Sequence, residues 1–513
     1  MTASLAVMLC GCTVGPDFQP PSAAVPATWL DGSRVTPAKV ASHAVATPID
    51  TAWWAVFHDP VLTALVQRGA AANLDVRIAA IRLAESRSQR AVAGAAQFPT
   101  LGANASYTRE LASNNGLMSL FGASSGAAGA AANGTGSGVT TVSSTATKSG
   151  GSTPLGLSQY GLDASWELDL WGRVRRSIES ADASVQLSQE AQRAALISTI
   201  AEIARDYVAL RGTQTTLRIT RENLDTAQQV LDLTRQRNQA GLVTDLDVID
   251  ASAQIATIQS QIPPLEQQVE AGINQLSFLV GEAPGNLRSE LNGSDVIPPA
   301  PPQVPVGLPS ELARRRPDIR QAEAELHQAT AAIGMAEADF YPQITLSGSA
   351  GVQALEFTNL GSWNSRQYSF GPTITLPIFE GGRLRGTLAL REAQQQEAAV
   401  SYQRTVLQAW HEIDDALTAF TTEQQRHDQL REAAAQNREA VVLARQRYTQ
   451  GVAGFLRVLD AERNRLATEQ QLASSTTTIS TNLVTLYKAL GGGWQDTIPL
   501  TAPSPPELRE PRS

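Results

Sequence analysis

Few side chains in the 513-residue sequence have the types and spacing that catalysis requires. The five histidines are scattered without metal-ligand spacing, at His43, His58, His327, His411 and His427. His411-Glu412 lacks the second histidine of a zinc-protease helix. The glycine-rich run 134–138 lies in low-complexity sequence without a following lysine, unlike a phosphate-binding loop. The sequence therefore predicts no enzyme, no metal site and no cofactor apart from a covalent lipid.

The two cysteines, Cys10 and Cys12, could support lipid attachment. A short apolar segment leads into Leu9-Cys10-Gly11-Cys12, which resembles a bacterial lipobox, where a signal peptidase cuts before a cysteine that then carries diacylglycerol. We predict that residues 1–11 are a lipoprotein signal peptide and 12–50 a tether with N-acyl and S-diacylglycerol lipid on Cys12. Thr13 after the cysteine fits sorting to the outer membrane. An incidental apolar start is the alternative, because the usual positively charged region is missing.

Charged side chains also gather in two stretches, Arg235–Ser252 and Arg445–Glu462, which match without gaps at an offset of 210. Arg235, Gly241, Leu246, Val248, Asp250 and Ala251 correspond to Arg445, Gly451, Leu456, Val458, Asp460 and Ala461. A constant offset indicates an internal duplication. We place repeat 1 at 51–295 and repeat 2 at 310–493, joined by the Pro-rich linker 296–309.

Each matched stretch is predicted to be the turn of a helical hairpin. The long helices are expected at 172–240 and 382–450, and the return helices at 243–280 and 455–490. Apolar residues recur at intervals of 4 and 3 in both long segments, which is coiled-coil spacing. At ~1.5 Å per residue each long helix would span roughly 100 Å. Pro263-Pro264 removes two helix donors, so we expect the first return helix to kink or break there.

Four amphipathic strands of about ten residues are also predicted. They lie at about 100–110, 160–170, 343–353 and 368–379, where apolar and polar residues alternate. Asp163, Glu167 and Asp169 are candidates for a wet face of the second strand. The Gly-, Ala-, Ser- and Thr-rich segment 112–158 is predicted to be a flexible loop, and the Pro-rich tail 494–513 to be disordered.

Composition and strand number restrict the class of protein. A net charge of −9 argues against a nucleic-acid partner, and no run approaches the ~18–20 apolar residues of a membrane-spanning helix. Four strands are too few to close a barrel with a lumen, and open strand edges are unstable in lipid. Strands of this kind would have to be completed by other copies, so the sequence predicts an obligate oligomer. A soluble antiparallel sheet with one wet face is the alternative.

Motifs along nearly the whole mature sequence resemble the outer-membrane efflux protein family, the TolC/OprM-like channels, in its NodT-type lipoprotein branch. They are LCGCTVGPDFQPP, WWAVFHDPVLTALV, WELDLWGRVR, RRPDIRQAEAEL, ADFYPQITL, FEGGRLR and the two turns. The resemblance implies a mainly α fold with a transmembrane β-barrel portion, in which a homotrimer forms a 12-stranded outer-membrane barrel and a long α-helical barrel in the periplasm. It also implies a periplasmic adaptor and an inner-membrane pump of the resistance–nodulation–division type as partners.

The resemblance further assigns roles to the turn residues. Gly241, Leu242, Val243, Thr244, Gly451 and Val452 match the adaptor-docking tips. Asp460, Asp247, Asp250 and Arg457 are candidates for a periplasmic gate. Three copies of one carboxylate near a common axis would repel each other and attract cations. The alternatives are that these acids are solvated turn residues and that the glycines only end helices.

The expected function is a passive outer-membrane conduit that exports drugs, solvents or other small molecules delivered by a pump. Nothing in the sequence could couple transport to ATP or protons. Type I protein secretion through the same fold is one alternative. A periplasmic lipoprotein scaffold of coiled coils is another, but it would not explain four strands with apolar faces.

Overall fold

The computed structural model describes residues 13–21, 42–45, 47, 50–110, 155–292, 296–307 and 315–493. The predicted signal peptide, Cys12, most of the tether, the loop between 111 and 154 and the tail 494–513 lie outside the described residues. The chain divides into two compact units. One is built around Val92–Arg175 and Gly334–Gly386, and the other comprises Gly15–Ala91, Arg176–Ile333 and the chain from Thr387 onward.

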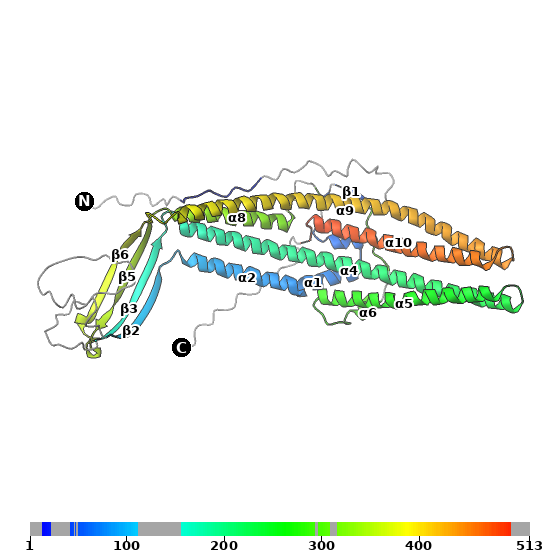
Figure 1. Ribbon diagram of the computed structural model, residues 1–513, viewed down its shortest axis with the longest axis horizontal. Coiled ribbons are helices and arrows are strands. Elements are labelled where there is room, and N and C mark those ends of the chain that lie inside the picture. Colours follow the sequence, from blue (N-terminus) through cyan, green and yellow to red (C-terminus); the bar gives the residue numbers. More distant parts are fainter. Residues whose placement is uncertain are drawn as a thin grey trace. The chain divides into compact units, whose positions relative to one another are not determined.

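The first unit contains a four-stranded antiparallel sheet in the order β2-β3-β5-β6 (Figure 1). The strands are β2 (Thr100–Glu110), β3 (Leu155–Leu168), β5 (Gln343–Ala354) and β6 (Arg366–Thr375). β3 begins five residues earlier than predicted, because Leu155 pairs with Glu110 at the end of β2. β6 ends before the predicted residue 379, since Pro377 has no N–H to donate to a neighbouring strand. Short 3-10 turns, Phe357–Asn359 and Trp363–Ser365, connect β5 to β6.

The register places most apolar residues of the four strands on one face, with Leu157 near the start of β3 on the other. Directly paired residues of antiparallel strands point to the same face. Leu162 pairs with Ala103 on one side and Ala350 on the other, and Trp166 pairs with Leu346. The opposite face is polar, with Asp163 paired to Ser349. The predicted alternation is therefore present in the sheet as one mainly apolar face and one mainly polar face.

Asp169 does not belong to the polar face, contrary to our prediction. β3 ends at Leu168, and the Asp169 carboxylate accepts hydrogen bonds from the backbone N–H groups of Val174 (3.1 Å) and Arg175 (2.9 Å). It thus satisfies unpaired donors at the start of a helix, as N-terminal caps do. Glu167 does lie on the polar face and forms an ion pair with Arg173.

Helices dominate the second unit, and some of them begin or end in the first. They include α1 (Pro60–Ala72), α2 (Leu74–Ala95), α4 (Arg173–Gln239), α5 (Asp245–Leu279), α6 (Arg288–Leu291), α8 (Pro317–Ala338), α9 (Arg383–Thr449) and α10 (Phe455–Ala489). α4 and α9 each have 67 residues, and the return helices α5 and α10 each have 35. The equal lengths agree with the internal duplication seen in the sequence. No helix in the described ranges is both long and apolar enough to cross a bilayer.

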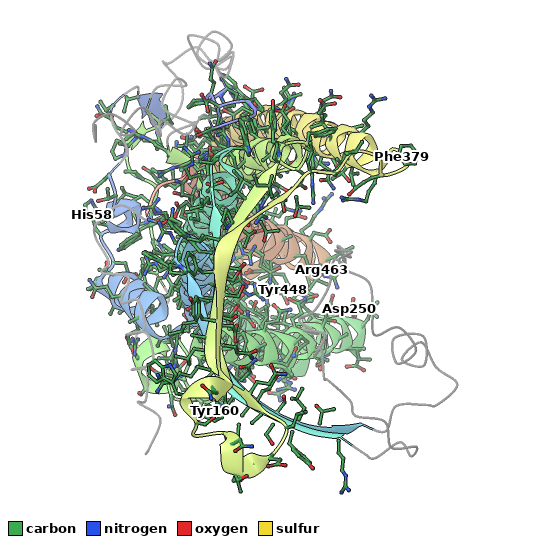
Figure 2. The ribbon with its side chains drawn as sticks, turned by 90° about the vertical axis from the view of Figure 1, so that its left-hand side faces the viewer. His58, Tyr160, Asp250, Phe379, Tyr448 and Arg463 are labelled. Carbon is green, nitrogen blue, oxygen red and sulfur yellow. The ribbon has the colours of Figure 1, made fainter. Side chains whose placement is uncertain are left out.

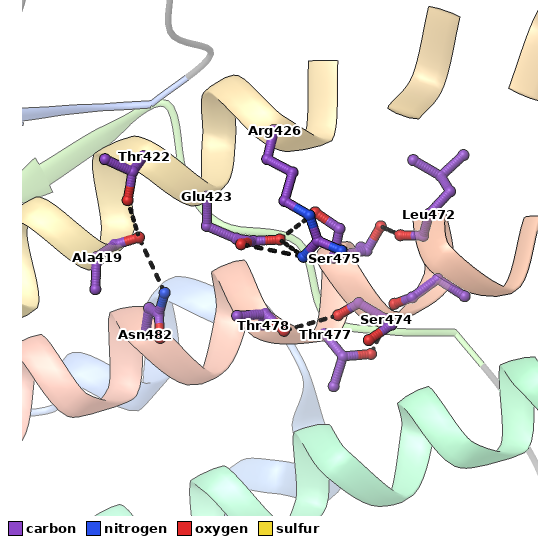
Figure 3. A network of polar contacts seen from close by, with 12 residues as sticks. Ala419, Thr422, Glu423, Arg426, Leu472, Ser474, Ser475, Thr477, Thr478 and Asn482 are labelled. Carbon is purple, nitrogen blue, oxygen red and sulfur yellow. Dashed lines mark hydrogen bonds and ion pairs between the residues drawn. The ribbon is translucent and has the colours of Figure 1, made fainter. Parts of the chain in front are cut away.

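Polar contacts hold each long helix beside its return helix (Figure 1). Arg221 of α4 pairs with Glu266 of α5 at 2.6 Å, and Arg438 of α9 pairs with Glu469 of α10 at 2.7 Å. Figure 3 shows further contacts between α9 and α10, including the 3.1 Å hydrogen bond from the Asn482 side chain to the Ala419 carbonyl. Polar side chains therefore contribute to the contacts within each hairpin.

Pro263-Pro264 does not break the first return helix, although a break is one of the two outcomes expected from the sequence. α5 continues from Asp245 through both prolines to Leu279. The carbonyls that lose their i+4 donors belong to Gln259 and Ser260, which are exposed, as are the prolines. Water can satisfy these carbonyls, so the helix tolerates the two missing donors there.

The aromatic motif near the N-terminal end of the second unit forms part of its core. Trp53, Trp54 and Phe57 lie in the 3-10 helix η3 (Trp53–Phe57) and are buried, and Trp53 stacks on Tyr487 of α10 with ring centroids 5.2 Å apart. The linker also packs here: β4 (Gln303–Pro305) pairs in parallel with β1 (His43–Val45) from the tether. The motif and the linker are thus structural elements that fix the hairpins to the rest of the unit.

Candidate functional site

The two hairpin tips turn on glycines in the left-handed conformation. Gly241 has φ +71° and Gly451 has φ +73°. The N–H groups of Leu242 and Val452 each donate to a carbonyl five residues back, on Arg237 and Arg447 respectively, both at 2.9 Å. This is the pattern of a glycine-terminated helix end. Both glycines therefore have a conformational role, whatever else binds at the tips.

The return helices begin differently in the two tips. At α5, the Asp247 carboxylate accepts hydrogen bonds from the backbone N–H and the hydroxyl of Thr244, both at 3.0 Å. At α10, Gly454 occupies the N-cap position and has no side chain to contribute. Two of the predicted site residues, Thr244 and Asp247, thus cap a helix within their own hairpin.

The other gate candidates, Asp250, Asp460 and Arg457, lie close to the tips and form no ion pair with any described residue. Asp250 and Asp460 occupy equivalent positions of the two repeats, and Asp250 is half-buried whereas Asp460 and Arg457 are exposed. The structure therefore leaves Asp250 and Asp460 available as paired carboxylate positions near the tips, one on each hairpin (Asp250 is labelled in Figure 2).

Apolar side chains cover the outer surface of both tips. Leu242 and Val452 are exposed at equivalent positions, as are Leu246 and Leu456. Val243 differs from its neighbour, since it packs against an apolar cluster between the hairpins. Sequence reasoning missed Leu246 and Leu456, although their match in the two repeats was a usable signal. Each tip therefore exposes an equivalent pair of apolar side chains to solvent.

An apolar cluster and one arginine hold the two tips together. The cluster contains Leu231, Ala251, Tyr448, Phe455, Val458 and Leu459. The Arg237 guanidinium lies 4.5 Å from the centre of the Tyr448 ring and donates to the carbonyl oxygens of Tyr448 and Thr449, the last at 3.3 Å. A cation at the last carbonyls of α9 is favourable because these groups lack helical donors and carry partial negative charge.

Further along the hairpins, Arg463 of α10 donates to the Gln254 side chain of α5 at 2.7 Å. Tyr448 and Arg463 both lie on the second hairpin, and both are labelled in Figure 2. The contacts made by Arg237 and Arg463 were not predicted from the sequence. The only signal was the repeated Arg-Gln-Arg at 235–237 and 445–447.

Comparisons with known families, relatives and solved structures all find outer-membrane efflux proteins or channels similar to this chain. The family described as outer membrane efflux protein matches residues 65–282 and 308–492. The antibiotic efflux pump outer membrane protein ArpC of Pseudomonas putida is 33% identical over 497 residues, covering 96% of this chain and 95% of the relative. The toluene efflux pump outer membrane protein TtgC of the same species has the same identity and coverage. The solved outer-membrane channel OprN superimposes with a TM-score of 0.81 at 32% identity, covering 94% of this chain and all (100%) of that one.

Proposed function

The chain belongs to the outer membrane efflux protein family, and from this we propose that three copies form a passive conduit for small molecules. In this proposal the twelve strands of the trimer close a β-barrel in the outer membrane, and the paired helices form a tunnel through the periplasm. A resistance–nodulation–division pump in the inner membrane supplies the free energy, and a periplasmic adaptor joins the pump to the tips.

The sheet with one apolar face carries the proposal. β2 and β6 are its two edges, and each has unpaired backbone donors and acceptors along one side. Such edges are too costly in lipid, so they must pair with strands of other copies if the apolar face is to contact hydrocarbon. Three sheets of four strands would give twelve, a number found among bacterial outer-membrane barrels.

The relatives support small molecules as the transported class. ArpC is named for antibiotic efflux and TtgC for toluene efflux. We therefore propose antibiotics and organic solvents as the substrates. The alternative is secretion of a protein through the same fold, with an ATP-driven exporter in place of the resistance–nodulation–division pump.

We further propose that the tips serve both docking and gating. The exposed Leu242 and Val452, beside Gly241 and Gly451, would contact the adaptor. Asp250 and Asp460 would contribute six carboxylates to the mouth of the trimer, and their mutual repulsion and attraction for cations would act there. Arg457 is proposed as a gate residue beside them, whereas Asp247 would act through the Thr244 cap that shapes the first tip.

Cys12 is proposed as the lipid-attachment site, which would anchor the protein in the outer membrane in addition to the barrel. The Cys12→Ala change tests the two anchors separately. We expect this variant to stay in the membrane until detergent is added, because the barrel remains. Release by salt or urea washing would favour the lipoprotein scaffold over the barrel.

Deletion of the gene, with complementation, tests the function as a whole. In a strain without another channel of this family, deletion should increase sensitivity to antibiotics and toluene, and the intact gene should restore resistance. Unchanged susceptibility, together with the loss of a secreted protein from the medium, would replace small-molecule efflux with protein secretion.

A further inference from the structure

The contact made by Arg237 is present only once among the described residues, although the arginine itself is repeated. Arg447 of α9 occupies the position of Arg237 in α4, at the offset of 210. Arg237 is half-buried against the end of α9, whereas Arg447 is exposed, and no described residue accepts a hydrogen bond from its side chain. Arg447 therefore repeats the arginine of the first hairpin but has no described acceptor like the end of α9 that Arg237 contacts.

Apolar residues show the same difference. Leu459 is 6% exposed within the cluster between the hairpins, but its equivalent in the first repeat, Ile249, is 63% exposed. Leu233 packs against that cluster, but its equivalent in the second repeat, Leu443, is 52% exposed. Within one chain, the α4–α5 hairpin packs against the α9–α10 hairpin. Ile249 and Leu443 would both be covered if the α9–α10 hairpin made the same kind of contact with the α4–α5 hairpin of another copy.

We propose that Arg447, Leu443 and Ile249 form the contact between neighbouring copies of this chain. The surface of α9 that carries Arg447 and Leu443 would face the α4–α5 hairpin of the next copy. Arg447 would donate to the partner subunit's Asn238 and Gln239 carbonyls, and Leu443 would pack near the partner subunit's Ile249. The proposal rests on the trimer of the proposed function and specifies which surfaces of its tips meet.

The acceptors at the end of α4 correspond to those that Arg237 uses at the end of α9. The Tyr448 carbonyl accepts from both Arg237 and the Gly451 N–H (3.0 Å), so it uses two lone pairs. The equivalent Asn238 carbonyl accepts the Gly241 N–H at 2.8 Å and has a second lone pair for another donor. The aromatic ring is missing from this second contact, because Asn238 replaces Tyr448. We therefore expect the contact between copies to be weaker than the one within a chain.

A second copy fits this surface better than an unrelated partner. The surface is complementary to another part of the same chain, so it forms a heterologous contact that either closes into a ring or continues as a filament. If the two repeats are related by about one sixth of a turn, three chains present six hairpins and the ring closes. One kind of contact would then alternate within and between chains around the tips.

Cysteine pairs test the contact directly in native outer membranes. The pair Leu443→Cys with Ile249→Cys, treated with a short bifunctional maleimide, should give covalent dimers and trimers on denaturing gels. The matched pair Leu233→Cys with Leu459→Cys should react within one chain and leave the monomer mass unchanged. Each single substitution controls for Cys10, Cys12 and random collisions.

The outcomes separate this contact from the trimer itself, whose presence is measured on the same membranes by native mass determination. Trimers without a Leu443–Ile249 crosslink would overturn the contact and leave the proposed function standing. Absence of trimers would overturn both. Arg447→Ala should lower the crosslinking rate between chains roughly two- to fivefold, the range for a cation at a helix C-terminus, and Arg447→Lys should restore part of it. An unchanged rate in Arg447→Ala would remove the arginine from the contact.

Discussion

The Tyr207 hydroxyl donates a 2.6 Å hydrogen bond to the Asp59 carboxylate, which joins α4 to the first turn of α1. The other oxygen of Asp59 accepts from the N–H groups of Val61 (2.9 Å) and Leu62 (3.2 Å). Burial, with the bond to Asp59, raises the pKa of Tyr207 well above its usual value. The aspartate of the Asp-Pro motif is thus both a helix cap and the acceptor for a buried hydroxyl 148 residues away.

Removing the Tyr207 hydroxyl should destabilise the fold. Tyr207→Phe loses a hydrogen bond to a charged group, so we expect a decrease of about 1.5–3 kcal/mol in the free energy of unfolding. Tyr487→Phe is the matched control, because the buried Tyr487 hydroxyl has no hydrogen-bond partner among the described residues. The control should be neutral or stabilising in thermal unfolding of the detergent-solubilised protein. Equal losses in both variants would show that the hydrogen bond from Tyr207 to Asp59 makes no specific contribution to stability.

Tyr487, the control residue for Tyr207, should make the stability of the protein depend on pH in the alkaline range. Burial, with a smaller effect of Asp50, raises the pKa of Tyr487 to about 12 from 10.0. The folded state retains the proton that the unfolded state loses, so this contribution is intact below pH 10 and decreases as the pH rises from 10 toward 12. Tyr487→Phe should flatten the decline of the melting temperature in that window. If the melting temperatures of the wild type and the Tyr487→Phe variant declined in parallel, Tyr487 would not be the source of the pH dependence.

Gly451 should be hard to replace for reasons of backbone conformation alone. No atom lies within 4 Å of a Cβ added there, but its φ is +73°. Gly451→Ala should therefore cost about 1–2 kcal/mol and increase hydrogen exchange at the tip. Gly454→Ser is the control within the same turn, because its φ of −71° suits any residue and serine is a preferred N-cap. Faster exchange in both variants would show that any added side chain disturbs this turn, and that backbone strain at Gly451 is not the cause.

The apolar face of the sheet makes a prediction about membrane assembly. Leu162→Arg puts a charge between Ala103 and Ala350, and near the bilayer midplane this should cost about 2–4 kcal/mol. Ser349→Arg, on the polar face opposite Asp163, should be tolerated. The fraction of folded protein in outer-membrane preparations measures both effects. Normal assembly of the Leu162 variant would indicate that this face does not contact lipid.

The sequence predicted the elements better than the contacts between them. The alternation of apolar and polar residues along the strands predicted the apolar face to which Leu162 belongs, because the two-residue period of a strand is a local property of the sequence. The constant offset located both tips, because a duplication preserves glycines such as Gly241 and Gly451. The bonds of Tyr207 to Asp59 and of Arg237 to the end of α9 join residues 148 and 211 positions apart, and no local pattern specifies which partners meet. Pro263 shows the limit of a local rule, because α5 is not broken there and the carbonyls that lose their donors are exposed to water.

The paired acids at the tips should control ion selectivity if they line the mouth of a trimer. Asp250→Asn and Asp460→Asn each remove three of six proposed carboxylates, and the double change removes all of them. We expect the preference for cations over anions to decrease stepwise, because converging carboxylates concentrate cations, and the effect should weaken at high salt. Reversal potentials of reconstituted channels in a salt gradient measure it. Asp225→Asn, further along α4, is the control for general loss of charge, and a reversal potential that is unchanged in the double variant would return these acids to the role of solvated turn residues.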